Sequence, residues 1–370
     1  MLYLVGKLFF HTFLRLFSSH IVLLSIGSLM AGLLSWWMLP RHWERLPHDH
    51  GKALVPGGQV SKGKPTGAGL ILALCILPAL VLVVPPDLPV YVAIVSLYLM
   101  MLFGYLDDRS AIPWGQLKKG LLDTFCCLLA AGALYFSGVN HVWLPLTSHV
   151  FVVPGWIYIP VAAFVLMVSV NALNCSDGVD GLAGSLGIMS LLSLSVLLYI
   201  VLGYKPVADY LLLPHYPDSA KWAILSTTIS GAFAGYLWYN AEPSKVLMGD
   251  AGSRMLGLAI GIAVLAAGNP LLIFVFAPVV FANGGTGLVK ILLLRLFKKL
   301  GFDTTPTPKL TPEEAARQNV IVRELHSVRF PLHDHCRKNK QWSNPQVLMR
   351  FMLVQALLIP ILFAFFTKVR

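Results

Sequence analysis

Charged residues are scarce in this chain. Only 12% of its 370 residues are Asp, Glu, Lys or Arg, whereas 56% are hydrophobic and the mean hydropathy is +0.72. A soluble globular protein carries roughly 25% charged residues. The shortage excludes an ordinary soluble fold and predicts a polytopic membrane protein. The length favours one integral membrane domain over residues 1–370 rather than several soluble domains.

Other features are missing as well. The five cysteines are scattered without paired zinc spacing, and no disulfide framework follows from them. The first apolar segment has no convincing cleavage site, so we expect no removed signal peptide. The net charge of +11 comes without a basic domain that carries a reading element, so we expect no nucleic acid partner.

Long apolar runs are abundant. Runs of about 20 residues suit a hydrocarbon core of about 30 Å. They predict an all-α protein of about ten transmembrane helices, preceded by an interfacial helix over residues 1–17. The expected spans are 19–39, 68–85, 88–106, 120–138, 151–171, 184–203, 222–240, 253–268, 270–296 and 347–367.

Basic residues concentrate in alternate loops, namely 41–67, 107–119 and 297–346. The positive-inside tendency places these loops in the cytoplasm and both termini outside. The loop 297–346 is long, and Thr311, Pro312 and Glu314 predict a capped surface helix from there to about Leu325. This orientation brings three acidic junctions to the cytoplasmic face of a cell membrane.

The first junction is the pair Asp107–Asp108 at the end of an apolar run. Paired carboxylates can bind a divalent cation or share a proton. Taken alone, the pair also fits a solvated helix end with a local contact to Arg109.

The second junction runs from Val170 to Gly181. Its polar residues recur every third position, which would place them along one helical face if the helix continued. A polar loop is also possible, but it leaves unexplained why so many hydrogen-bonding groups lie between two spans. Gly178 and Gly181 would permit a helix break or a close backbone approach. The recurring residues are Asn171, Asn174, Asp177 and Asp180.

The third junction, Met248 to Ser253, precedes another span. Its glycines could expose N–H groups at a helix start, where phosphate binds readily. Asp250 would hold a cation that bridges to the phosphate, and Mg²⁺ fits best because it prefers hard oxygen ligands and retains water. Asn240 and Lys245 lie just upstream.

Two further patterns carry weaker signals. His333 and His335 could bind metal or phosphate, although such a pair is more often a surface feature. Lys52, Lys62 and Lys64 lie among glycines and could form an anion-binding loop, although the positive-inside bias also explains them.

In order and spacing, these motifs resemble the polyprenyl-phosphate N-acetylhexosamine-1-phosphate transferases, and most closely their muramoyl-transferring branch. The resemblance runs from about Ser61 to the C-terminus. It rests on segments 61–66, 107–108, 171–181, 248–253 and 331–335, together with Asn240, Trp342 and 347–351. Leu247 and Asp334 depart from the family's pattern.

The resemblance implies a bundle of ten helices in the bacterial inner membrane, multi-pass, with a cytoplasmic active site. It implies transfer of phospho-N-acetylmuramoyl-pentapeptide from UDP-N-acetylmuramoyl-pentapeptide to undecaprenyl phosphate, with Mg²⁺ as cofactor. The catalytic residues would be Asp107, Asp108, Asp250 and His333, with Asp250 as the metal ligand. The substrate-binding residues would be Lys62, Asn174, Asp177, Asp180, Asn240 and His335.

Alternatives stay open at this point. The same chemistry with UDP-N-acetylglucosamine is the nearest, because residues 109–112 look more like that branch. A transporter or lipid flippase would place acids near mid-span and carry a repeated pair of broken helices. Asp123 and Lys290 lie inside or near apolar runs, but the main acids gather at one membrane face. A purely structural membrane protein gives no reason for three acidic junctions. The oligomeric state is open, with a homodimer among the options.

Overall fold

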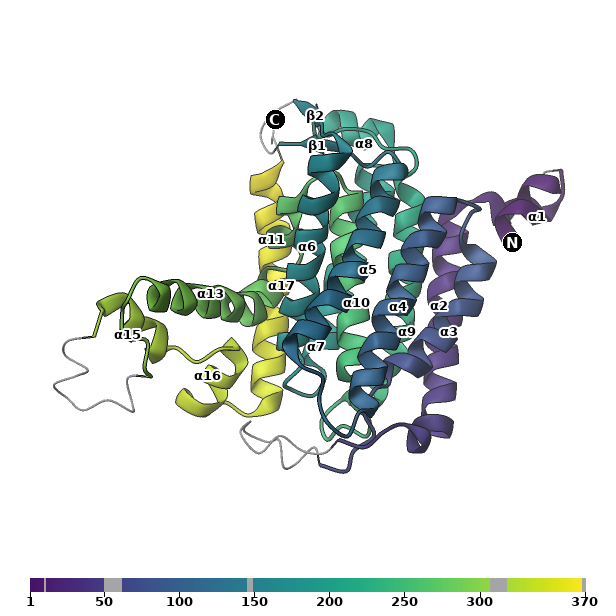
Figure 1. The fold of residues 1–370 in the computed structure, drawn as a ribbon. Helices are drawn as coiled ribbons and strands as arrows, with labels where there is room; N and C mark the ends of the chain where they lie inside the picture. The colour runs from purple at the N-terminus through teal and green to yellow at the C-terminus, as the bar shows by residue number, and fades with distance from the viewer. Residues whose placement is uncertain (10, 50–61, 145–148, 307–317, 368–370) are drawn as a thin grey trace.

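Long helices stand side by side in one bundle in the computed structural model, which describes residues 1–9, 11–49, 62–144, 149–306 and 318–367 (Figure 1). Eight helices among these residues are long and apolar enough to cross a membrane, so the predicted all-α membrane fold is confirmed. Seven of the eight contain α2 (His20–His42), α4 (Leu88–Arg109), α5 (Gln116–Phe136), α6 (Gly155–Ser176), α7 (Leu182–Val196), α10 (Gly249–Ala266) and α17 (Asn344–Phe366), and the eighth runs over Pro278–Lys299. Two further helices, α3 (Gly69–Val83) and α9 (Ser219–Asn240), belong to the same bundle.

Short elements join and flank these helices. Strands β1 (His141–Trp143) and β2 (Val150–Val152) pair antiparallel at the upper end of the bundle in Figure 1, toward which both termini lie. The other short elements are α1 (Leu2–Leu8), η1 (Phe13–Ser18), η2 (Trp43–Arg45), η3 (Leu197–Val201), α8 (Lys205–Tyr210), η4 (Pro270–Leu272), α11 (Ile273–Phe276), α12 (Pro278–Val280), η5 (Phe281–Gly285), α13 (Thr286–Lys299), α15 (Val320–Ser327) and α16 (Leu332–Asn339).

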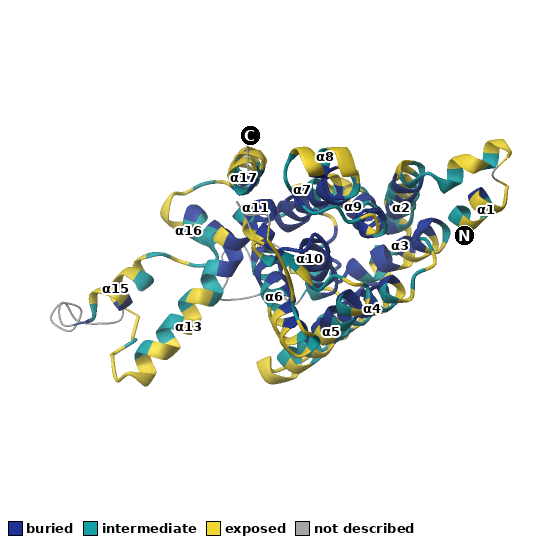
Figure 2. Cartoon of the chain, turned by 90° about the horizontal axis from the view of Figure 1, so that it is seen from above, coloured by how far each residue is buried: buried dark blue, intermediate teal, exposed yellow. Residues whose placement is uncertain are grey.

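Helix α10 forms the centre of the bundle. Seen from above, it is surrounded by the buried faces of its neighbours, and 89% of its apolar window is buried (Figure 2). A helix that is apolar on every side belongs in such a position. Gly257 lets α6 approach closely, because a Cβ there would lie 2.8 Å from the Cα of Val170. Residues at the N-terminus of α10 are therefore held by helices on several sides.

The span predicted at 270–296 begins later than expected. Residues 270–276 form the short elements η4 and α11, and Pro278 then opens a continuous helical run of α12, η5 and α13 over Pro278–Lys299, which is long and apolar enough to cross a membrane. Proline lacks the N–H that would continue a helix and clashes with the preceding turn. Helix α13 then leaves the bundle sideways, and none of its residues is buried (Figure 1).

Two other sequence predictions are corrected at the ends of the fold. Residues 1–17 form two short helices, α1 and η1, and a Cβ at Gly6 would lie 2.4 Å from the backbone N of Ser18 where the two helices meet. The surface helix expected from Thr311 appears as α15, which begins after Asn319, whose side chain accepts from Ile321 N at 2.9 Å. The predicted cap at Thr311, Pro312 and Glu314 lies outside the described residues.

Close contact between α2 and α9 depends on glycine. A Cβ at Gly231 of α9 would lie 2.1 Å from the carbonyl oxygen of Ser28 in α2. Such close approach of small residues is a common basis of helix packing in membranes. By contrast, a Cβ at Gly132 of α5 would meet no atom within 4 Å.

We therefore expect Gly231→Ala to destabilise the protein by about 1–3 kcal/mol, because the added methyl group forces two backbones apart. Gly132→Ala is the matched control and should be neutral or slightly stabilising, because alanine favours a helix over glycine. Thermal unfolding of both variants in detergent measures the difference. Equal melting temperatures for the two variants would contradict the packing argument.

Candidate functional site

The end of α4 caps the start of α10. The two carboxylate oxygens of Asp108 accept hydrogen bonds from the backbone N–H groups of Asp250 and Ala251, each at 3.0 Å. Gly249 makes this contact possible, because its φ is +71° and a Cβ there would lie 2.4 Å from Asp108 Oδ2. The helix start that was expected to receive phosphate is thus engaged by Asp108, whose negative charge suits a helix N-terminus.

Lys119 of α5 lies between two of the predicted catalytic carboxylates. Its ammonium group contacts Asp107 Oδ2 closely and lies 3.3 Å from Asp250 Oδ2. The other oxygen of Asp107 accepts from Trp114 N at 2.9 Å. The Asp107 side chain is only 5% exposed, so both of its oxygens are held in fixed positions. The first and third acidic junctions therefore form one site.

This donor set suits a magnesium ion. No group of three or more His, Cys, Asp or Glu side chains stands ready as a metal site in the described ranges. Mg²⁺ does not need one, because it is commonly held by one or two carboxylates together with substrate phosphates and water. The Lys119 ammonium group already occupies a position between Asp107 and Asp250 that attracts a cation. Asp250, whose side chain is more exposed than that of Asp107, is the residue that would hold the ion.

The second junction joins this site through Asn174. Its Oδ1 accepts from Ser253 Oγ of α10 at 3.0 Å. Helix α6 ends at Ser176, and Asp177 is its C-cap, so the expectation of one continuous helical face through Asp180 is wrong. Gly181, with φ of +78°, is the N-cap of the next helix, α7. Asn171 lies apart from the acids and donates to Met167 O within its own helix.

The turn that follows α6 is held by the end of α9 and by the segment between α9 and α10. Asp180 Oδ2 accepts from Ser244 N at 3.0 Å and lies 3.7 Å from Lys64 Nζ. Asn240 accepts from Gly181 N at 2.8 Å and donates to Val246 O at 2.9 Å. These contacts bring the predicted nucleotide-sugar residues Asn240 and Asp180 together at one turn.

The structure brings Lys64 of the basic loop to this turn. Lys64 donates to Ser244 Oγ at 3.0 Å, whereas Lys62 is exposed in the turn just before it. The loop is anchored to the start of α10 by two backbone hydrogen bonds, from Leu247 N to Pro65 O and from Ala68 N to Leu247 O. Lys52 lies outside the described residues.

His333 is buried against the same turn. A Cβ at Gly178 would lie 2.3 Å from His333 Nε2, so glycine is required for the contact. The backbone N and the ring Nδ1 of His333 both contact Asn283 Oδ1, at 2.8 and 3.1 Å. Because an amide oxygen only accepts, Nδ1 carries the proton and a neutral ring offers Nε2 as an acceptor. Burial lowers the pKa of His333 to about 4, although Asp334 nearby favours the charged form.

His335 has a different environment. It is half-buried, and its Nδ1 accepts from Arg329 N at 3.4 Å within the loop that precedes α16. Of the two histidines predicted for the site, the structure places only His333 against the turn at 177–181.

Several residues of the site were not predicted. In the sequence, Lys119 is only one basic residue of the loop 107–119, and Asn283 and Ser244 belong to no motif. Arg254 could have been found from the sequence, since it is a charge inside an expected apolar span, as is Asp123. Opposite charges in two spans predict a buried pair.

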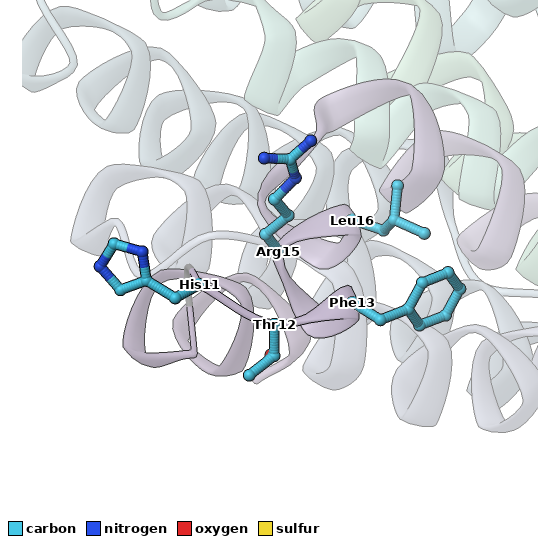
Figure 3. A pocket seen from close by; sticks show the side chains of 5 residues that line it. All are labelled: His11, Thr12, Phe13, Arg15 and Leu16. Atoms are coloured by element: carbon cyan, nitrogen blue, oxygen red, sulfur yellow. The ribbon is translucent and has the colours of Figure 1, made fainter.

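A surface depression in the N-terminal segment is unrelated to this site. It is lined by His11, Thr12, Phe13, Arg15 and Leu16 (Figure 3). The same segment is tied to the far end of α3, where the terminal amine donates to Val81 O and Leu82 O. The acidic site lies at the opposite end of α4.

Comparison with known proteins agrees with this site. Residues 90–268 match the family described as glycosyl transferase family 4. Two relatives come from two strains of Treponema pallidum, one of them the Nichols strain. Each is 40% identical to this chain over 347 residues, which cover 93% of this chain and 89% of the relative. Both are named phospho-N-acetylmuramoyl-pentapeptide-transferase. At this identity and coverage, the chain belongs to the phospho-N-acetylmuramoyl-pentapeptide-transferase family.

The buried neutral His333 predicts a pH effect on stability. Its pKa is about 4 in the folded protein and near 6.5 when unfolded, so the unfolded state binds the proton first as the pH falls. Stability should be full above about pH 6.5 and decrease toward pH 4, by about 2 kcal/mol at pH 5 from this residue. Thermal unfolding across this range measures the loss.

His333→Asn should flatten the pH dependence of unfolding. His335→Asn is the matched control and should retain it, because it removes a neighbouring histidine and leaves the buried His333 in place. An unchanged slope in His333→Asn would contradict the assignment.

Proposed function

We propose that this protein transfers phospho-N-acetylmuramoyl-pentapeptide from UDP-N-acetylmuramoyl-pentapeptide to undecaprenyl phosphate, giving lipid I and UMP for peptidoglycan synthesis. The observation that carries the proposal is the convergence of Asp107, Asp108 and Asp250 at one end of the bundle, next to the 177–181 turn. The basic loops support a cytoplasmic position for this end, in the inner membrane of a bacterium.

The reaction brings two anions together, a lipid phosphate and a diphosphate. Positive charge at the site must offset their repulsion, and Lys119 and Lys64 supply it from two sides of the site. Mg²⁺ held by Asp250 would stabilise the charge that develops on the departing UMP. The position of Asp250 at the N-terminus of α10 is set by the cap that Asp108 provides.

Asp107 is placed to receive a proton from the lipid phosphate. The second pKa of a phosphate monoester is near 6, so this proton is lost easily at pH 7 and positioning contributes more than base catalysis. Both oxygens of Asp107 are already engaged, by Trp114 N and Lys119. A carboxylate held in this way is poorly placed to form a covalent phospho-aspartate, which favours direct attack by the lipid phosphate.

The turn at 177–181 suits the nucleotide-sugar. Asp177 and Asp180 belong to this turn, Asn240 accepts a hydrogen bond from Gly181 N, and His333 packs against Gly178. Lys62 and Lys64 approach from the loop at the other side. Asp108 serves as a positioning residue for Asp250.

An assay for UMP tests the proposal directly. Purified protein, Mg²⁺ and undecaprenyl phosphate should release UMP and form a lipid-linked product with UDP-N-acetylmuramoyl-pentapeptide. Turnover of UDP-N-acetylglucosamine alone would replace the proposed donor. Omitting the lipid should abolish UMP release, because direct attack needs the acceptor. Stoichiometric UMP without lipid would establish a covalent intermediate instead.

Asp250→Asn should lower kcat on the order of 10²–10³-fold, because it removes a charge that acts on the transition state. The variant should stay folded, since asparagine preserves the shape of the side chain and Asp108 still caps α10. Asp209→Asn, in an exposed ion pair of α8 with Lys205, is the matched control and should retain activity. Full activity of Asp250→Asn would remove this residue from the proposed metal role.

A further inference from the structure

A pair of opposite charges is buried one helical turn from the acidic site. Arg254 of α10 and Asp123 of α5 are each 3% exposed, and Arg254 Nη1 donates to Asp123 Oδ1 at 3.2 Å. Both residues lie within helices that are apolar enough to span a membrane. Charges in such helices are costly, and they usually mark a functional site.

The same guanidinium group also contacts a residue of the site. Arg254 Nη2 lies 3.3 Å from Asp250 Oδ2, four residues earlier on α10. Side chains on a helix lean toward its N-terminus, so an arginine at this position reaches back to the residue one turn before it. Arg254 thus joins Asp250 to Asp123 with two different nitrogens.

Arginine is suited to this arrangement and lysine is not. The planar guanidinium can hold two carboxylates in fixed directions, whereas an ammonium group on a flexible stem acts as a point charge. Asp250 Oδ2 is held at 3.3 Å by Lys119 as well, so two cations from two helices fix the same oxygen.

Burial of this arginine has a cost that packing alone does not explain. Its Nε–H is buried and has no hydrogen-bond acceptor among the residues that the structure describes. Replacing a buried ion pair with apolar side chains often leaves stability unchanged or improves it. A pair that contributes little to stability and touches a site residue has a reason to be there other than packing.

We propose that Arg254, held by Asp123, is a positioning residue that fixes the direction of the Asp250 carboxylate and weakens its hold on a divalent cation. The inference rests on the proposed role of Asp250. The positive member of the pair is the nearer one to Asp250, so the pair opposes cation binding at that carboxylate. A cation would then be held firmly only when the diphosphate of the nucleotide-sugar adds its own oxygens.

Manganese(II) alone, titrated against the full-length protein and followed by electron paramagnetic resonance, provides a readout that does not depend on turnover. The charge-neutral variant Asp123→Leu with Arg254→Met removes the pair without leaving an unpaired charge. It should bind Mn²⁺ roughly threefold tighter or more, since a nearby positive charge is gone. Its kcat should fall about tenfold, since Asp250 is free to rotate.

The variant Arg254→Lys distinguishes the effect of the positive charge from the effect of fixing the direction of the Asp250 carboxylate. It keeps the positive charge but cannot hold both carboxylates, so Mn²⁺ affinity should stay within about twofold of the wild type while kcat falls. A merely structural role would lower the melting temperature and move neither quantity. If the double variant fails to fold, Arg254→Lys decides the proposal alone.

The inference is overturned if the folded double variant, or Arg254→Lys in its place, has the kcat of the wild type. It is also overturned if loss of the pair weakens Mn²⁺ binding. Comparison of the wild type with Asp250→Asn tests the underlying proposal separately: Mn²⁺ binding that is the same in both would refute a cation role for Asp250, whatever the pair does.

Discussion

The two hydrogen bonds from the start of α10 to Asp108 are the contacts on which the site depends. They join the end of α4 to the beginning of the central helix, and each is a charge-assisted bond at a helix N-terminus. Asp250 is the second residue of that helix, so its position follows from the cap. Lys119 can bridge Asp107 and Asp250 only because α4 and α10 are held together in this way. The adjacent carboxylates Asp107 and Asp108 therefore have different partners: Asp107 pairs with Lys119, and Asp108 caps α10.

The charges around Asp250 explain why a divalent cation suits the site. Asp107, Asp123 and Asp250 are set against Lys119 and Arg254, which leaves one negative charge from three carboxylates and two cations. The charge of Asp108 is offset by the partial positive charge of the helix N-terminus. A site with nearly balanced charge holds a cation weakly by itself and more strongly once phosphate oxygens share it. Ion and nucleotide would then bind together.

Much of this could be predicted from the sequence, because apolar runs and acidic interruptions are local signals. The apolar runs predicted helix ends near Asp107, Asn174 and Asp250. The order of spans and basic loops predicted that these three ends lie at the same face of the membrane. The failures have a common cause in contacts between distant segments. Lys119 looked like an ordinary loop cation, and only its packing against α4 and α10 shows what it does. Likewise, the apolar run at 270–296 gives no sign that the long helix begins only at Pro278, or that Gly284 lies against the carbonyl oxygen of Ala172 in α6.

Glycine connects the packing of the bundle to the chemistry of the site. At Gly249 a side chain would collide with Asp108, at Gly178 it would collide with His333, and at Gly104 it would lie 2.5 Å from the carbonyl oxygen of Asp250. In each case the missing side chain lets a functional group approach the backbone of another helix. The acids and the histidine alone do not make the site, because the same side chains would lie farther apart on helices that could not approach so closely. The glycines are therefore as much a part of the site as the carboxylates, although they touch no substrate.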